Sequence, residues 1–200
     1  MLATSFAFGG LPLAHAADEA PDALIKRLSD DVLAAIKADK SVAGDIGKVI
    51  TLVDTRILPH VNFQRMTASA VGPAWRQATP EQQKRLQDEF KILLIRTYSG
   101  AIAQVADETV SVKPLRAAPA DAEVVVRTEV RGRGDPIQLD YRLEKTPGQG
   151  AGWKIYNLNV LGVWLVETYR SQFAQEINAK GVDGLIASLS ERNKSNAKRS

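Results

Sequence analysis

The spacing of apolar residues changes twice along this chain, and these changes limit the folds that it can adopt. Up to residue 105, apolar side chains recur at every third or fourth position, the repeat of an amphipathic helix. From 109 to 160 they recur at every second position, the repeat of a strand with one buried face. From 167 onward the helical repeat returns. Helices, then strands, then helices predict one α+β domain in place of alternating βαβ units.

The first part of the chain is predicted to contain four helices, over 21–38, 45–57, 63–71 and 80–105. The start of the last helix is the best defined, because Thr79, Pro80 and Gln82 form a capping box with proline at the first helical position. Its apolar residues fall on one stripe that includes Leu86, Phe90, Leu93, Leu94, Tyr98, Ile102 and Val105. We expect this long helix to cover the apolar face of the sheet.

Four strands are predicted, over 109–116, 123–131, 137–145 and 152–160. Short turns rich in Gly and Pro join them, so they form an antiparallel meander with one apolar and one polar face. The alternation changes phase in the fourth strand, where Trp153 and Ile155 lie on one face but Leu158 and Val160 on the other. A β-bulge or burial on both sides explains such a change. The uncharged apolar segment 161–166 follows, and we expect it to line a core or a cavity.

The residue types that usually carry chemistry are nearly absent. The chain has no cysteine, which excludes disulfides, thiolate metal sites and thiol nucleophiles. Its two histidines are His15 and His60, and we expect His60 to be a structural residue between two helices. The Gly-x-Gly pairs at 132–134 and 148–150 lie in hairpin turns and do not open a helix, so they are not phosphate loops. We therefore expect no catalytic residue, no metal and no cofactor.

Basic residues gather at the end of the chain. The net charge is +3, and the last ten residues contain four basic residues and one acidic residue: Arg192, Lys194, Lys198, Arg199 and Glu191. The rest of the chain carries 22 basic and 22 acidic side chains. A neutral body with a short basic end argues against nucleic acid as a partner. The sequence predicts a basic flexible tail over 191–200.

The N-terminal segment has the pattern of an export signal. Residues 2–14 are uncharged and mostly apolar, and they lead into an A-x-A cleavage pattern that ends at Ala16. No basic residue precedes Lys26, so the basic start of such a signal is missing. We expect a signal-peptide remnant over 1–16, followed by one exported domain over 17–190.

Six segments between residues 58 and 190 resemble the motifs of one known family. They are LPHVNFQRM (58–66), WRQATPEQ (75–82), FKILLIRTY (90–98), WK (153–154), GVWLVETYRSQF (162–173) and GVDGLI (181–186). Together they are similar to segments of the MlaC-type periplasmic phospholipid-binding proteins, also called the toluene-tolerance family. This chain has Trp164 where the family often has serine.

The resemblance implies an NTF2-like or cystatin-like α+β fold, in which a four-stranded antiparallel sheet covered by helices encloses a deep apolar cavity. It implies a soluble carrier in the periplasm that shuttles phospholipid between the inner and outer membranes, as part of an ABC-transporter-linked lipid-asymmetry system. The implied partners are the phospholipid, an MCE-domain subunit of the inner-membrane ABC transporter and an outer-membrane lipoprotein–porin complex.

A lipid carrier has to keep acyl chains out of water. A diacyl lipid has roughly 30 methylene groups, and at ~0.8 kcal/mol each their exposure costs on the order of 20 kcal/mol. We expect contacts to these chains from the helix over 80–105, the apolar strand face and the segment after it: Phe63, Met66, Phe90, Leu94, Tyr98, Val126, Ile137, Leu139, Tyr141, Val163, Trp164 and Tyr169. Because guanidinium groups pair with phosphate, the predicted head-group contacts at the rim are Arg96, Arg142 and Arg170.

Two other functions remain open from the residues alone. NTF2-like cavities also host enzymes, and an enzyme acting on an apolar substrate needs a buried acid or base, for which the apolar strand face offers only Tyr141. An envelope adaptor or chaperone that binds no lipid needs a filled core and an exposed apolar patch.

Overall fold

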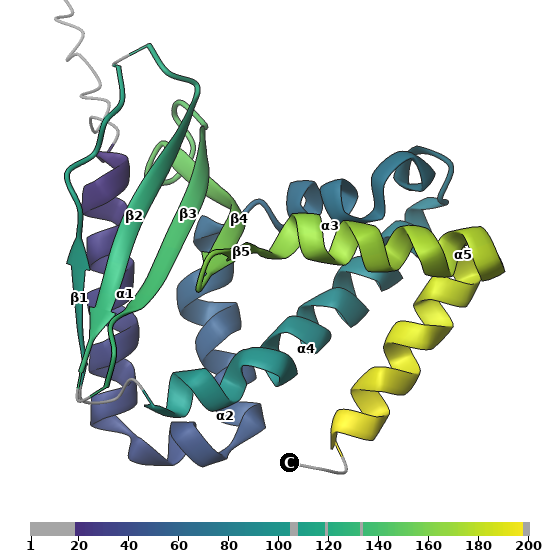
Figure 1. Ribbon diagram of the computed structural model, residues 1–200, viewed down its shortest axis with the longest axis horizontal. Coiled ribbons are helices and arrows are strands. Elements are labelled where there is room, and N and C mark those ends of the chain that lie inside the picture. Colours follow the sequence, from purple (N-terminus) through teal and green to yellow (C-terminus); the bar gives the residue numbers. More distant parts are fainter. Residues whose placement is uncertain (1–18, 105–107, 119, 133, 198–200) are drawn as a thin grey trace, which may run out of the picture.

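The computed structural model describes residues 19–104, 108–118, 120–132 and 134–197, and it places a sheet beside a group of helices (Figure 1). The expected signal remnant lies outside these residues. The helices are α1 (Pro21–Ala38), α2 (Ile46–Leu52), α3 (Phe63–Val71), α4 (Pro80–Gln104) and α5 (Leu165–Ala197). The strands are β1 (Thr109–Val112), β2 (Glu123–Arg131), β3 (Ile137–Lys145), β4 (Trp153–Val160) and β5 (Val163–Trp164). Short 3-10 or π turns cover Lys40–Gly44, Val53–Ile57, Leu58–His60 and Gly72–Arg76.

The sheet is an antiparallel meander with the strand order β1-β2-β3-β4-β5. The predicted meander is confirmed, but the described chain has five strands and not four. The fifth strand was missed because two residues are too few to show an alternation. β1 is shorter than predicted and ends at Val112, because Pro114 has no N–H group to continue the ladder.

A register shift in β4 accounts for the change of phase seen in the sequence. Leu143 pairs with Ile155, whereas its neighbour Arg142 pairs with Asn157, so Tyr156 is an extra residue in β4. Of the two explanations, the β-bulge is the correct one. Trp153, Ile155, Leu158 and Val160 therefore all lie on one side of the sheet. This side, which also carries Val124, Val126, Leu139 and Tyr141, is called the inner face.

The helix that covers the inner face is α1, and not α4 as expected. Leu24 and Ile25 of α1 are fully buried in a cluster with inner-face residues, called the sheet core: Leu24, Ile25, Leu28, Val124, Val126, Leu143, Trp153 and Ile155. Figure 1 shows α1 lying along the sheet, with α3, α4 and α5 to its side.

The apolar stripe of α4 faces other helices. It packs with α3 and α5 in a cluster called the helical core: Met66, Ala70, Val71, Leu86, Phe90, Leu93, Leu165, Val166, Tyr169, Phe173, Leu185, Ile186 and Leu189. The Phe90 ring centre lies 4.9 Å from that of Tyr169 and 5.2 Å from that of Phe173, both in edge-on contact. This contact occupies the face of α4 that was expected to cover the sheet.

Residues 191–197 are helical, whereas a flexible tail was expected over 191–200, of which 198–200 lie outside the described residues. α5 turns at Gly181, where φ is 71°, and then runs along α4 to Ala197. Leu185, Leu189 and Asn193 follow at four-residue spacing and all are buried. The Asn193 side-chain amide donates to the backbone carbonyl of Glu89 at 2.9 Å, so packing on α4 holds these last turns.

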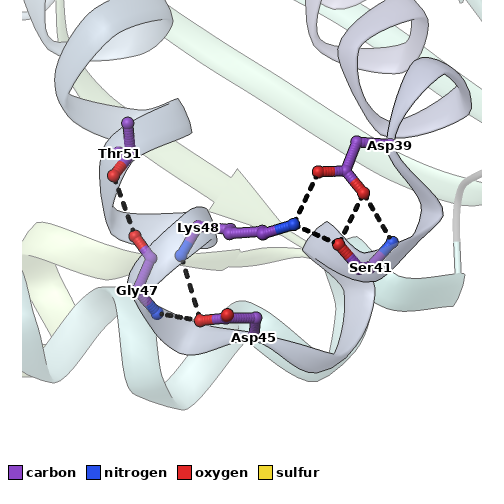
Figure 2. A network of polar contacts seen from close by, with 6 residues as sticks. All are labelled: Asp39, Ser41, Asp45, Gly47, Lys48 and Thr51. Atoms are coloured by element: carbon purple, nitrogen blue, oxygen red, sulfur yellow. Dashed lines mark hydrogen bonds and ion pairs between the residues drawn. The ribbon is translucent and has the colours of Figure 1, made fainter.

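A polar corner joins the end of α1 to the start of α2 (Figure 2). The Asp39 carboxylate accepts hydrogen bonds from the Lys48 ammonium group at 2.8 Å and from the Ser41 backbone at 3.0 Å. Asp45 caps α2 by accepting from the backbone N–H groups of Gly47 and Lys48. The corner sits over a third apolar cluster: Ile36, Val42, Val49, Leu52 and Ile95.

This corner predicts a pH dependence of stability. The hydrogen bonds from Lys48 and Ser41 lower the pKa of Asp39 from 3.8 to about 2. A lowered pKa in the folded state stabilises the fold above the ordinary value, and this stabilisation is lost as the pH falls from 3.8 through about 2. We expect Asp39→Asn to lower the urea midpoint at neutral pH and to approach the wild-type midpoint as the pH nears 2. The effect is small because the pair is exposed. An Asn variant whose deficit is the same at every pH contradicts this assignment.

Candidate functional site

The inner face of the sheet is closed at one end and partly open at the other. Near the sheet core, Val126 and Leu143 are buried beneath α1. Toward the hairpin between β2 and β3, the inner-face side chains of β3 and β4 are only half-buried: Ile137, Leu139, Leu158 and Val160. On β2 the inner-face residues Thr128 and Val130 are buried at this end as well. Leu139 pairs directly with Val160 across the two strands, so these side chains form one continuous apolar surface.

The helical core meets this open end. Leu158 and Val160 pack against the helical core, and so do the half-buried Leu94 and Tyr98 of α4. The half-buried apolar residues contributed by the sheet and by α4 are called the seam: Leu94, Tyr98, Ile137, Leu139, Leu158 and Val160. Each seam residue is neither fully buried nor fully exposed.

The turn between β4 and β5 extends the seam into water. Val163 pairs with Val160 and is 51% exposed, and Leu161 is 65% exposed. Leu161 has a φ of 53°, a left-handed conformation that costs a non-glycine residue about 1 kcal/mol or more. Its N–H donates to the Gln138 carbonyl at 3.1 Å, and the buried Asn159 accepts from the Gly162 N–H at 2.8 Å. These bonds hold the exposed apolar tip in place.

The predicted acyl-chain contacts fall on two connected surfaces. Six belong to the helical core or pack on it: Phe63, Met66, Phe90, Leu94, Tyr98 and Tyr169. Five lie on the inner face: Val126, Ile137, Leu139, Tyr141 and Val163. Trp164 is separate from both, because it pairs with Asn159 on the opposite, outer face of the sheet. There the Arg142 guanidinium lies 3.9 Å above the Trp164 ring centre.

The three predicted rim arginines have different partners. Arg142 lies on the outer face and forms an ion pair with Glu167. Arg170 uses its Nε to donate to the carbonyl of Ser69 at 2.9 Å. Arg96 lies about 160° around α4 from Leu94, since each helical residue turns by about 100°. Its Nε is buried and has no hydrogen-bond partner among the described residues. Which of the three arginines contacts a phosphate therefore stays a prediction.

Sequence reasoning missed Leu158 and Val160 as members of the site. Strict alternation along the sequence placed them on the opposite face from Ile155, and only the register shift between the paired strands shows that all three share the inner face. It also missed Arg65, which links α3 to the outer face. Arg65 forms ion pairs with Glu123 and Glu144, residues far from it in the sequence, so no local pattern indicates them.

The walls of the seam are electrically neutral at physiological pH. Burial raises the pKa values of Tyr98, Tyr141 and Tyr169 above their ordinary value near 10, so their hydroxyls stay protonated. The described residues contain no cluster of three His, Asp or Glu side chains suited to a metal ion. Within the same residues, no helix combines the length and apolar character needed to span a bilayer. Such neutral walls suit an apolar ligand.

Two hollows are present on the surface of the described chain. One, of about 450 Å³, lies between α4 and the end of α5 and is lined by Leu93, Glu176, Ser188, Glu191, Arg192, Ser195 and Asn196. The other, of about 230 Å³, lies between α1 and β1. Neither is lined by a seam residue, so the deep apolar cavity stays a prediction.

Comparison with known proteins identifies relatives over most of the chain. The family model for the MlaC protein matches residues 26–191. The toluene tolerance protein Ttg2D of Pseudomonas putida is 27% identical over 174 residues, which cover 86% of this chain and 80% of that protein. The intermembrane phospholipid transport system binding protein MlaC of Haemophilus influenzae is 22% identical over 178 residues, covering 88% and 83%.

A solved structure agrees in fold. It is a phospholipid-binding protein from Ralstonia solanacearum in complex with a phospholipid, and it is 51% identical to this chain. The two superpose with a TM-score of 0.84 over 88% of this chain and 98% of that one. The predicted α+β architecture is thus shared with a known protein. Because the family model spans well over half of its residues, this chain belongs to the MlaC family.

Proposed function

We propose that this protein is a soluble periplasmic carrier that holds the acyl chains of a phospholipid at the seam. The observation that carries the proposal is the Ralstonia structure, which is 51% identical over 88% of this chain and contains a phospholipid. Identity at that level over nearly the whole domain favours a shared ligand class. The head group stays at the open end of the seam, beside the exposed tip formed by Leu161 and Val163.

The half-buried state of the seam supports this location. A fully packed core such as Val126 and Leu143 leaves no room for a chain, and opening it forfeits close contacts. Leu139 and Leu94 still expose apolar surface, so covering them with acyl chains removes water from both partners. The buried helical-core residues Phe90 and Tyr169 form the wall behind the seam. They can contact lipid only if the helices move apart.

The wider role is that of a shuttle between membranes and not of an enzyme. The name of the Haemophilus relative assigns that protein to an intermembrane phospholipid transport system. We propose the same kind of role here, with an MCE-domain subunit of an inner-membrane ABC transporter and an outer-membrane lipoprotein–porin complex as the docking partners. On β3 the inner face carries two ionisable side chains, the exposed Lys145 at the end of the strand and Tyr141, whose raised pKa makes it a poor base at neutral pH.

One observation favours a second candidate. The clusters of the described chain are well packed, and Leu161 and Val163 are exposed at a turn held by hydrogen bonds. A packed core with an exposed apolar tip also fits an envelope adaptor that binds a protein and no lipid. The two candidates differ in what the purified protein contains.

The first test is native mass spectrometry of the purified mature protein, followed by organic extraction. We expect one phospholipid-sized mass per chain and a phospholipid in the extract, because the buried chains dissociate slowly at a cost that grows with each methylene group. Protein that remains lipid-free after incubation with phosphatidylglycerol vesicles contradicts the carrier proposal and favours the adaptor.

The second test places a charge in the seam. We expect Leu94→Asp and Leu139→Asp each to reduce co-purified phospholipid at least about tenfold, because a carboxylate facing acyl chains loses its hydration. Gln64→Asp and Gln175→Asp add the same charge at exposed helical positions and serve as controls with unchanged lipid content. Circular dichroism confirms that each variant is folded. Full lipid occupancy in both folded seam variants would show that the chains bind elsewhere.

A further inference from the structure

Tyr141 marks the boundary between the open and closed parts of the inner face. On one side along β3 lies Leu139, which is half-buried, and on the other lies Leu143, which is fully buried. Across the sheet, Tyr141 pairs with Val126 of the sheet core and with Leu158 of the seam. Its side chain packs against the sheet core. An acyl chain that follows the seam inward from the exposed end therefore meets the Tyr141 ring.

The Tyr141 hydroxyl lies beside side chains of two other elements. Burial raises its pKa, and the neighbouring side chains of Thr128 on β2 and Ser29 on α1 oppose that rise. Both neighbours are fixed to the backbone, because Thr128 donates to the Leu139 carbonyl and Ser29 to the Ile25 carbonyl, each at 2.8 Å. Thr128 is fully buried. The Tyr141 ring packs against the sheet core, so swinging it aside would lose those close apolar contacts, which is unfavourable.

We propose that Tyr141 is the end stop of the seam and sets the acyl-chain length that the protein accepts. This inference rests on the proposed function and adds a specificity residue to it. A chain that reaches the ring cannot extend further, because Val126, Leu143 and Leu24 fill the space beyond. Methylene groups in excess of the seam remain in water at the open end. Each methylene group that becomes buried raises the affinity about fourfold, whereas a methylene group that stays in water does not change the affinity.

The experiment is a competition among chain lengths. Lipid-stripped wild-type protein, Tyr141→Leu, Tyr141→Ala and Tyr141→Phe are each incubated with an equimolar mixture of phosphatidylglycerols with fourteen-, sixteen- and eighteen-carbon chains. Native mass spectrometry then gives the bound fraction of each lipid, and thermal unfolding confirms that each variant is folded. Tyr141→Phe keeps the ring and is the matched control. Tyr141→Leu removes less side-chain volume than Tyr141→Ala, so it tests the proposal even if the alanine variant does not fold.

We expect the leucine and alanine variants to raise the ratio of the longest to the shortest bound lipid by about tenfold, since two or more methylene groups gain burial. We expect the phenylalanine variant to stay within about twofold of wild type, because the stop remains in place. A wild-type distribution in folded Tyr141→Leu overturns the proposal, as does an equal loss of all three lipids, which would make Tyr141 a general wall. Wild-type protein that binds none of the lipids refutes the proposed function itself, an outcome distinct from both.

Discussion

The register shift between β3 and β4 is the feature on which the arrangement of both cores depends. If Tyr156 took part in a regular alternation and formed no bulge, Leu158 and Val160 would lie on the outer face, opposite Ile155. With it, one strand contributes Ile155 to the sheet core and, three and five residues later, Leu158 and Val160 to the surface that meets the helical core. A single strand thereby joins two apolar clusters. The same shift turns Tyr156 toward the outer face, where polar side chains link the sheet to the helices.

Two arginines make this link on the outer face. The Arg65 guanidinium of α3 lies 3.6 Å from the Tyr156 ring centre and forms ion pairs with Glu123 and Glu144 of the sheet. These contacts hold α3 against the outer face. Burial opposes its charge, but the two carboxylates prevail and raise the Arg65 pKa. Arg142 forms a similar link to Glu167 at the start of α5. The helices are thus attached to the sheet by polar contacts on one face, while the apolar seam lies on the other.

Local patterns in the sequence were sufficient to predict the helices and strands, but not to predict which of them pack against each other. The capping box at Thr79 and the alternation in 123–145 depend on neighbouring residues, so the long helix and the meander could be predicted. The choice of α1 as the cover depends on a fit between Leu24 and strands about a hundred residues away, which no periodicity records. The face on which Trp164 lies could not be predicted for a related reason: a two-residue strand has no alternation from which its face can be read.

The contrast between the seam and the two cores bears on how a carrier can both hold and release lipid. Burying all of a diacyl lipid in a rigid, complete cavity would stabilise the complex by on the order of 20 kcal/mol, close to the upper limit of known affinities, and release would then be very slow. A site lined by half-buried residues such as Leu139 already has part of its apolar surface covered without ligand. The protein surface therefore adds only its still exposed part to the binding free energy, and in the proposed carrier a partner that covers the seam's exposed end can shift the balance toward release.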